Sequence, residues 1–304
     1  MRILVTGGAG FIGSHIAEYY QDLAEVRVID NLATGYADNL KGLDVELHQA
    51  SILDRDSLRD AMDDIDYVYH LAAMVSVPES VEKPEECIDV NSKGTLNVLE
   101  AAEEAGVKKL SFSSSAAIYG EREENPKREE LLPDPRSPYA VTKLSGENLC
   151  HMFACSGRLP TVSLRYFNVY GPRQDPDSAY AAAVPAFISR ASKGRNLTVF
   201  GDGHQTRDFI NVKDVVRANV FACTKLENSG VYNVACGRTI TINELAATVI
   251  RVVGKEGVTY EKGPERPGDI RHSLGDNSKL QSAGFVPTVP LEEGLCETVD
   301  YFCG

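Results

Sequence analysis

The chain begins with Arg2-Ile-Leu-Val-Thr6, continues with Gly7-Gly-Ala-Gly10-Phe-Ile-Gly13, and then enters a segment of helical character. An apolar run, a glycine-rich turn and an amphipathic segment in this order predict a strand, a turn and a helix. Gly7 permits the tight turn, Gly10 lets the backbone approach a pyrophosphate, and Gly13 allows close packing of helix on strand. Because the first N–H groups of such a helix attract phosphate, this stretch predicts a dinucleotide site.

A carboxylate follows the second apolar run, Glu25-Val-Arg-Val-Ile-Asp30, and lies seventeen residues beyond Gly13. At the end of a strand, Asp30 can accept hydrogen bonds from both ribose hydroxyls of NAD, and it would repel the additional phosphate of NADP. The alternative is a structural role as a helix cap or turn residue. We expect NAD to be the cofactor.

Tyr139-Ala-Val-Thr-Lys143 places a tyrosine and a lysine four residues apart in a stretch that predicts a helix. That spacing puts both side chains on one helical face. A free tyrosine has a pKa of about 10, which is too high for a base at neutral pH. A nearby ammonium stabilises the phenolate and lowers that pKa. Such pairs also occur by chance on exposed helices, so the Ser113-Ser114-Ser115 run upstream matters to the interpretation.

Strands and helices alternate through the first part of the chain. Strands are expected at 2–6, 25–30, 45–48, 66–71, 108–112 and 161–166, with helices at 56–62, 84–105 and 139–155. This alternation predicts an α/β fold with a doubly wound parallel (Rossmann) sheet. Ligands of such sheets lie beyond the carboxyl ends of the strands. Several polar or glycine-rich segments fall at those ends, namely the Gly7 turn, Asp30, His70–Ala73, Ser113–Ser115 and Tyr166–Asn168.

The alternation of strands and helices ends after residue 170. From there on, prolines and glycines interrupt it, and arginines appear in loops. We expect residues 1–170 to form an NAD-binding Rossmann domain, with 208–236 returning to it through strands at Asp208–Asn211 and Gly230–Val234. Residues 171–207 and 237–304 are expected to form a smaller C-terminal substrate-binding lobe. Glu121–Glu130 is expected to be an exposed loop whose charges are only solvated.

The composition narrows the class of protein. The 304 residues are 43% hydrophobic and 25% charged, which is ordinary for a globular protein. A net charge of −13 disfavours nucleic acid and anionic membrane surfaces as partners. Seven cysteines without a Cys-x-x-Cys pair favour free thiols over a metal site. With no visible signal peptide and no apolar run of about 20 residues, a cytoplasmic location is expected.

Taken together, the motifs resemble the extended short-chain dehydrogenase/reductase family, and within it the nucleotide-sugar 4-epimerases of the UDP-glucose/UDP-N-acetylglucosamine type. The resemblance covers about residues 1–300. The segments that carry it are Gly7–Gly13, Asp30-Asn31, His70-Leu-Ala-Ala73, Asn91, Phe112–Ser115, Ser137-Pro-Tyr139 with Lys143, Leu164–Asn168, Gly201-Asp-Gly203, Arg207-Asp208 and Arg266-Pro-Gly-Asp269.

The resemblance implies a role for each matching residue. Tyr139 is the acid/base, Lys143 holds the nicotinamide ribose and tunes Tyr139, and Ser115 binds the sugar 4-hydroxyl. The implied NAD contacts are Gly7, Gly10, Phe11, Ile12, Gly13, Asp30, Asn31, Ser51, Ile52, Leu71, Ala72, Ala73, Asn91, Ser113, Tyr139, Lys143 and Tyr166. Ser51-Ile52 stands where relatives have an Asp-Ile pair, and Val75 stands where some epimerases have a phosphate-binding lysine.

The substrate implied by the resemblance is a UDP-sugar. Asn168, Arg207 and Arg266 would bind its diphosphate, for which a guanidinium is well suited. Asp269 would bind the uridine ribose. Ser273 aligns with the residue beside the sugar 2-position, where a small side chain admits an N-acetyl group. Relatives also pair two helices per subunit, which here predicts a homodimer through Pro84–Ala105 and Tyr139–Cys155, with Met152 and Phe153 as apolar surface.

Two other kinds of protein remain as alternatives. Dehydratases and UDP-glucuronate decarboxylases share the fold, but they carry an acidic residue beside the active-site serine or threonine, where this chain has Ser115-Ala116-Ala117. A non-catalytic NAD-binding sensor usually lacks the tyrosine or the lysine, and this chain keeps both. The sequence therefore favours a 4-epimerase that acts on UDP-N-acetylglucosamine and on UDP-glucose.

Overall fold

The computed structural model describes residues 1–176, 182–265 and 270–303, and its chain forms two compact units. Unit 1 consists of Met1–Gly120, Leu131–Tyr166 and Val216–Asn233. Unit 2 consists of Glu121–Glu130, Phe167–Val215 and Val234–Gly304. Both units are therefore assembled from separate stretches of chain, and each is described by itself below.

Unit 1 is built on a seven-stranded sheet with the order β11-β6-β5-β4-β1-β2-β3. Its strands are β1 (Arg2–Thr6), β2 (Glu25–Ile29), β3 (Val45–His48), β4 (Tyr67–His70), β5 (Lys109–Ser115), β6 (Thr161–Tyr166) and β11 (Gly230–Val234). The pairings from β3 across to β6 are parallel. This order is that of a doubly wound sheet, as the sequence predicts.

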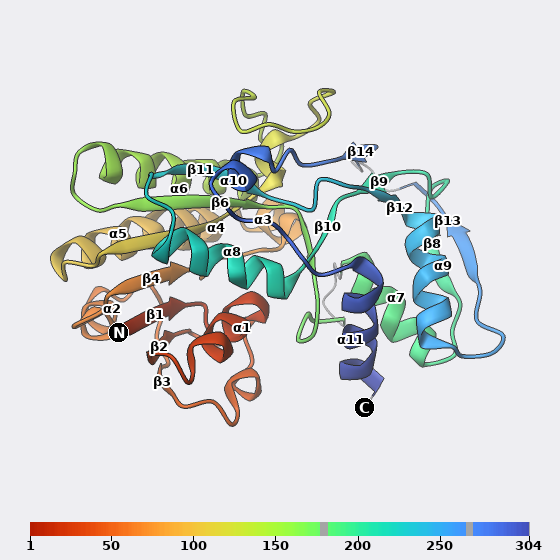
Figure 1. The fold of residues 1–304 in the computed structure, drawn as a ribbon, viewed down its shortest axis with the longest axis horizontal. Helices are drawn as coiled ribbons and strands as arrows, with labels where there is room; N and C mark the ends of the chain where they lie inside the picture. The colour runs from red at the N-terminus through yellow and green to blue at the C-terminus, as the bar shows by residue number, and fades with distance from the viewer. Residues whose placement is uncertain (177–181, 266–269, 304) are drawn as a thin grey trace. The chain divides into compact units, whose positions relative to one another are not determined.

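Helices cover both faces of this sheet (Figure 1). The helical segments of unit 1 are α1 (Phe11–Tyr20), η1 (Ala37–Leu40), α2 (Arg55–Met62), α3 (Val77–Glu82), α4 (Pro84–Ile88), η2 (Asp89–Lys93), α5 (Gly94–Glu104), η3 (Ala116–Tyr119), α6 (Pro138–Cys155) and most of α8 (Val212–Thr224). Alternate residues of β1 point to opposite faces of the sheet. Leu4 belongs to the core under α2, α5 and α6. Ile3 and Val5 belong to the core under α1 and α8.

Unit 2 has a core of its own, formed by three helices and short strands. Its elements are β7 (Asn168–Tyr170), α7 (Ala183–Ser192), β8 (Leu197–Phe200), β9 (Thr206–Arg207), β10 (Phe209–Asn211), β12 (Ile240–Thr241), α9 (Ile242–Val253), β13 (Tyr260–Gly263), β14 (His272–Ser273), α10 (Ser278–Ser282) and α11 (Leu291–Cys303). Phe187, Leu245 and Leu295 come from α7, α9 and α11 and meet in this core. The strands form the small sheets β10-β7, β12-β9-β14 and β13-β8.

Three expectations about the elements need correction. Asp208–Asn211 does not return to the main sheet, because β10 pairs with β7 in unit 2, whereas β11 does join the main sheet. The helix expected over 84–105 contains a π-helical segment at Asp89–Lys93. The loop Glu121–Glu130 is not merely solvated, since Lys127 is buried and bridges to Gly275.

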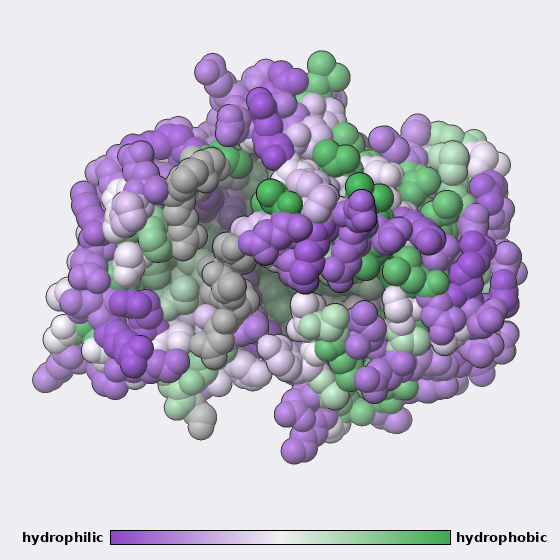
Figure 2. All heavy atoms as spheres, turned by 180° about the vertical axis from the view of Figure 1, so that it is seen from behind, coloured by the Kyte–Doolittle hydropathy of each residue, from purple (hydrophilic) through white to green (hydrophobic). Residues whose placement is uncertain are grey.

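The surface of unit 1 carries exposed apolar side chains on α3, α4 and α6. Val81, Ile88, Val141 and Met152 are each about half exposed, whereas Phe153 is fully buried and offers no surface to a partner. Figure 2 shows several hydrophobic residues gathered among hydrophilic ones in the upper right of that view. Within the described part of the chain, no helix has the length and apolar character needed to cross a bilayer.

Candidate active site

The glycine-rich turn between β1 and α1 has the geometry that a phosphate cradle needs. Gly7 has a φ of +68°, and a Cβ there would lie 2.7 Å from the backbone nitrogen of Ala72. A Cβ on Gly13 would lie 2.2 Å from the Gly7 carbonyl oxygen. Helix α1 begins after Gly10 without a side-chain cap. The start of α1 is therefore bare backbone with a positive dipole end, which suits a pyrophosphate.

Asp30 follows β2 and is buried. Its two carboxylate oxygens accept hydrogen bonds from the backbone N–H groups of Ala9 at 2.9 Å and Leu32 at 2.8 Å. Each oxygen can accept a further bond, so the carboxylate keeps capacity for ribose hydroxyls. Asp30 also ties the glycine-rich turn to the end of β2, and it thus has a structural role beside the predicted one.

Ser115, Tyr139 and Lys143 meet at the carboxyl end of β5. Ser115 ends β5, and Tyr139 and Lys143 lie one turn apart on α6, as the spacing predicts. The Ser115 hydroxyl lies close enough to the Tyr139 phenol to lower its pKa. The ammonium of Lys143 donates to the Ser113 carbonyl oxygen at 2.8 Å and lies 5.7 Å from the centre of the Tyr139 ring. The three groups form a constellation for moving a proton.

Within the protein alone the pKa of Tyr139 is raised, so the predicted lowering depends on the positive charge that a bound nicotinamide would add. Burial raises that pKa, and the hydrogen bond with Ser115 offsets part of the rise. Burial also lowers the pKa of Lys143 to about 8. Lys143 directs its ammonium at a carbonyl and not at the phenol oxygen, which explains the difference. A phenolate at this position needs further positive charge beside it.

Ser113 and Tyr166 form a buried polar group that also includes Asn219. The Ser113 hydroxyl lies 2.9 Å from the Tyr166 hydroxyl, which donates to Asn219 Oδ1 at 3.0 Å. Burial raises the pKa of Tyr166 to about 12. Ser111 donates to the same Asn219 oxygen. Asn219 comes from α8, far along the chain, and no local pattern marks it, so the sequence did not identify it.

Asn91 lies in the π-helical segment and is buried. Its amide group binds the backbone of Met74 through both Oδ1 and Nδ2, at 2.7 and 3.0 Å, and its Nδ2 also donates to Thr142 at 3.0 Å. Thr142 belongs to α6 and lies between Tyr139 and Lys143 in sequence. Asn91 therefore fastens the segment after β4 to α6, the helix that carries Tyr139 and Lys143. Its predicted contact with the cofactor stays a prediction.

The other predicted cofactor contacts lie around the same strand ends. Leu71 and Ala72 donate their N–H groups to Thr6, which holds the ends of β4 and β1 together, and Ala73 follows them. Ser51 caps a turn through Leu53 N–H, Ile52 is in the core against Gly94, and Asn31 accepts from Ala33 N–H. Phe11 and Ile12 open α1. Each of these cofactor contacts remains a prediction.

Unit 2 brings together three of the predicted substrate residues. Arg207 in β9 is in register with Ser273 in β14, and the side chain of Asn168 donates to the Asp208 carbonyl oxygen at 2.9 Å. Asp208, which directly follows Arg207, is buried. Its carboxylate accepts from the N–H groups of Cys236, Gly237 and Gly275, at 2.9, 2.9 and 3.3 Å. Arg266 and Asp269 lie outside the described residues.

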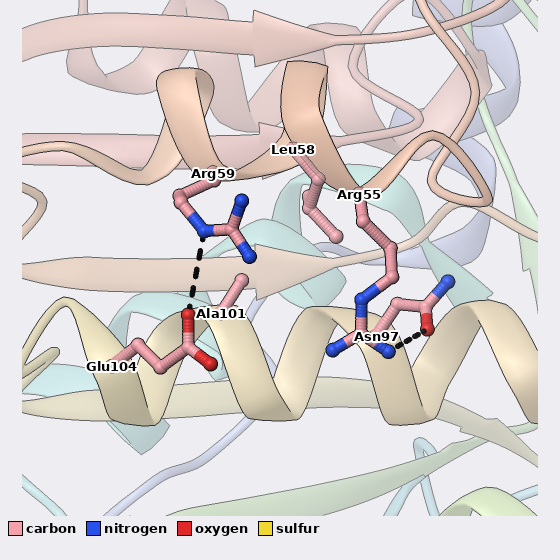
Figure 3. A pocket seen from close by; sticks show the side chains of 6 residues that line it. All are labelled: Arg55, Leu58, Arg59, Asn97, Ala101 and Glu104. Carbon is pink, nitrogen blue, oxygen red and sulfur yellow. Dashed lines mark hydrogen bonds and ion pairs between the residues drawn. The ribbon is translucent and has the colours of Figure 1, made fainter.

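Two hollows in unit 1 lie apart from these groups. The crevice in Figure 3, between α2 and α5, is lined by Arg55, Arg59 and Glu104 among others, and its volume of about 10 Å³ admits about one water. A cavity of about 350 Å³ lies between α6, β6 and β11 over the buried ion pair of Glu147 and Arg165. Neither hollow is lined by Ser115, Tyr139 or Lys143.

Comparison with known proteins agrees with this geometry. Residues 3–235 match the model of the NAD-dependent epimerase/dehydratase family. The chain belongs to this family. The solved UDP-N-acetylglucosamine 4-epimerase of Methanobrevibacter ruminantium, in complex with UDP-N-acetylmuramic acid, is 42% identical, with a TM-score of 0.95 over 99% of this chain and 97% of that one. This chain is therefore an extended short-chain dehydrogenase/reductase with a Rossmann sheet, as its motifs indicate.

Other family members show the range of reactions. The Thermus thermophilus UDP-glucose 4-epimerase, solved with NAD, is 41% identical, with a TM-score of 0.91 over 100% of this chain and 99% of that one. A UDP-N-acetyl-α-D-glucosaminuronate decarboxylase of Bacillus cytotoxicus is 36% identical over 99% of this chain and 97% of its own length. Relatives of comparable identity therefore include both epimerases and a decarboxylase, and the residues of the site have to distinguish the two reactions.

Proposed function

We propose that this family member is a NAD-dependent 4-epimerase of UDP-hexoses that interconverts UDP-N-acetylglucosamine with UDP-N-acetylgalactosamine and UDP-glucose with UDP-galactose. The observation that carries the proposal is the Ser115–Tyr139–Lys143 constellation, which offers a proton acceptor and no neighbouring carboxylate from the same segment. The similarity to two solved 4-epimerases at 41–42% identity supports it.

The residues present fit NAD. A side chain at Gly7 or Gly13 would collide with backbone, so the turn is kept free of side chains where a pyrophosphate would lie. Asp30, with capacity for two further hydrogen bonds, would hold the adenosine ribose, and Lys143 would hold the nicotinamide ribose. NAD, when bound, would supply the hydride acceptor and donor that chemistry at the sugar C4 needs.

The chain's own residues move the proton. Tyr139, as the phenolate, takes the proton of the 4-hydroxyl while Ser115 holds that hydroxyl by a hydrogen bond. The sugar becomes a 4-keto sugar, turns over, and receives the proton back from Tyr139. The cationic nicotinamide would favour the charged form of Tyr139, and the ammonium of Lys143, 5.7 Å from the centre of the Tyr139 ring, would add positive charge to the site. Together these charges would offset the burial that raises the Tyr139 pKa.

The substrate assignment rests on unit 2. Arg207 and Asn168 would bind the diphosphate, together with Arg266, and Asp269 would bind the uridine ribose. Ser273 lies in β14 in register with Arg207, and its small side chain would leave room for a 2-acetamido group. We therefore propose that both N-acetylated and plain UDP-hexoses are substrates.

The test is product analysis after separate incubation with UDP-N-acetylglucosamine and UDP-glucose. We expect the corresponding galacto sugars from the wild-type protein and a loss of activity of roughly 10²-fold or more in Tyr139→Phe, because the phenol oxygen carries the proton. The variant should keep its thermal stability. Near-wild-type activity of Tyr139→Phe would reject the mechanism, and release of CO₂ from a UDP-uronate without epimerisation of either hexose would show a decarboxylase instead.

A further inference from the structure

The loop Glu121–Glu130 follows the segment that carries Ser115 and precedes the helix that carries Tyr139, yet it is part of unit 2. Within the loop, Lys127 is only 3% exposed. Lys127 donates its N–H to the Leu274 carbonyl oxygen at 2.7 Å and accepts from the Asp276 N–H at 2.8 Å. The Lys127 ammonium donates to the Arg122 carbonyl oxygen, which closes the loop on itself. Through these two backbone hydrogen bonds, the loop pairs with residues 274–276 as a short strand would.

Side chains complete this attachment. Asn125 Oδ1 accepts the N–H of Leu274 at 3.2 Å, and Arg128 forms an ion pair with Asp276 at 3.2 Å. The other side of the same segment is held by Asp208, which donates its N–H to the Ser273 carbonyl oxygen at 3.0 Å and accepts from Gly275 N–H at 3.3 Å. Residues 273–276 are therefore fixed from two sides.

We propose that Glu121–Glu130 is a positioning loop for substrate choice, and that Asn125 is the positioning residue through which it sets the place of Ser273. This inference rests on the proposed function, in which Ser273 borders the sugar 2-position. Leu274 directly follows Ser273, so the bond from Leu274 N–H to Asn125 fixes the peptide group next to Ser273. Without that bond, Ser273 gains freedom, and the room for a 2-substituent changes.

Asn125 is the residue of choice for a test because it is exposed and outside the core of unit 2, whereas Asp208 is fully buried. Asn125→Ala removes the acceptor. Asn125→Asp keeps an acceptor oxygen at the same place. Glu123→Gln changes an exposed charge of the same loop and serves as the matched control.

The experiment compares kcat and KM of these three variants with the wild type on UDP-N-acetylglucosamine and UDP-glucose, together with amide hydrogen exchange in residues 272–276. For Asn125→Ala we expect faster exchange and a KM for the N-acetylated sugar raised roughly three- to tenfold, as for the loss of one hydrogen bond. The KM for UDP-glucose should change less than about twofold, and kcat should stay similar. Asn125→Asp and Glu123→Gln should resemble the wild type.

Two results would overturn the inference: unchanged exchange in Asn125→Ala, or faster exchange with an unchanged ratio of the two KM values. Failure of the proposed function looks different, because the wild type would then epimerise neither sugar. In that case the same variants are compared by calorimetric affinity for UDP-N-acetylglucosamine, UDP-glucose and UDP-glucuronate. An affinity ratio altered only in Asn125→Ala supports the loop's role, and an unaltered ratio or no binding rejects it.

Discussion

At the scale of single residues, His70 shows how burial sets a proton affinity. Its ring is buried at the end of β4, 2.7 Å from the Thr6 hydroxyl and 2.9 Å from the Thr95 hydroxyl. Burial lowers the pKa of His70 to about 3. An unfolded chain binds a proton at this histidine below about pH 6.5, and the folded chain does not. Stability contributed by neutral His70 is therefore present above about pH 6.5 and falls as the pH falls towards 3.

This difference gives a measurable pH dependence. Between pH 7 and pH 5 the wild type should lose about 2 kcal/mol of unfolding free energy through His70 alone, since one pKa unit corresponds to about 1.4 kcal/mol. His70→Gln should be less stable at pH 7, because two buried hydroxyls lose a partner, but its loss between pH 7 and pH 5 should be smaller by that amount. Urea unfolding of both proteins at the two pH values measures it, and equal losses would refute it.

Ser273 carries a second prediction at this scale. Ser273→Tyr places a ring where the acetamido group of the sugar would lie, and overpacking of this kind costs about 1–3 kcal/mol. Turnover of UDP-N-acetylglucosamine should fall roughly ten- to hundredfold, and that of UDP-glucose should be largely kept. Steady-state kinetics on both sugars decides the matter. An equal loss on both would show that Ser273 does not border the 2-position.

Local sequence spacing predicted the residues that act together within one turn or one helix. Gly7, Gly13, Tyr139 and Lys143 were found in this way, because their geometry follows from a short stretch of backbone. Asn219 is invisible to such reasoning, since its partners Ser111 and Tyr166 are distant in sequence. That the fold by itself raises the Tyr139 pKa could not be predicted from the sequence, because burial and the aim of Lys143 are properties of the folded chain.

At the scale of elements, the exposed apolar residues of α3, α4 and α6 concern assembly. Val81 and Met152 are 61% and 47% exposed, on helices that pack against each other. We predict a homodimer through these helices, which would remove that apolar surface from water. Val81→Glu combined with Met152→Glu should raise the dimer dissociation constant about 100-fold or more, because it places like charges in the interface.

Light scattering at micromolar concentration measures the dimer. Leu132→Glu is the matched control, since Leu132 is 74% exposed in unit 1 but lies on none of these helices. It should leave the dimer intact. A monomeric wild type, or dissociation by Leu132→Glu alone, would contradict the prediction.

The sequence predicted the elements of unit 1 well, and those of unit 2 only in part. Buried parallel strands such as β1, with Ile3, Leu4 and Val5 in succession, contain continuous apolar runs and are easy to recognise. β10 has the same character, but its partner is β7, and a three-residue strand carries no information about which sheet it joins. α3 begins at a Ser76 cap with Pro78 in its first turn, and six residues are too few to show a helical periodicity.

At the scale of the whole molecule, the chain passes several times between the two units. Residues 216–233 return to unit 1, where Val216 and Cys223 are buried in the core with Ile16 and Tyr20. A chain shortened to residues 1–166 lacks this cover and should expose apolar surface and aggregate. Residues 1–166 joined to 216–233 by a flexible Gly/Ser linker should stay in solution. Gel filtration and cooperative urea unfolding test both, and equal behaviour of the two chains would refute the prediction.

The outer strand β3 has one more effect. It is the last strand of its sheet and only four residues long, and Glu46 within it pairs with Arg27 at 2.9 Å and with His48 at 3.0 Å. An open strand edge is a template on which another molecule can add its own backbone. Addition here would have to bury the Glu46 carboxylate and the guanidinium of Arg27, and hydrogen bonding from Arg27 keeps the pKa of Glu46 low, so the charge persists in mild acid. These few charged side chains therefore disfavour the addition of another molecule's strand to β3, and with it fibril growth at high protein concentration.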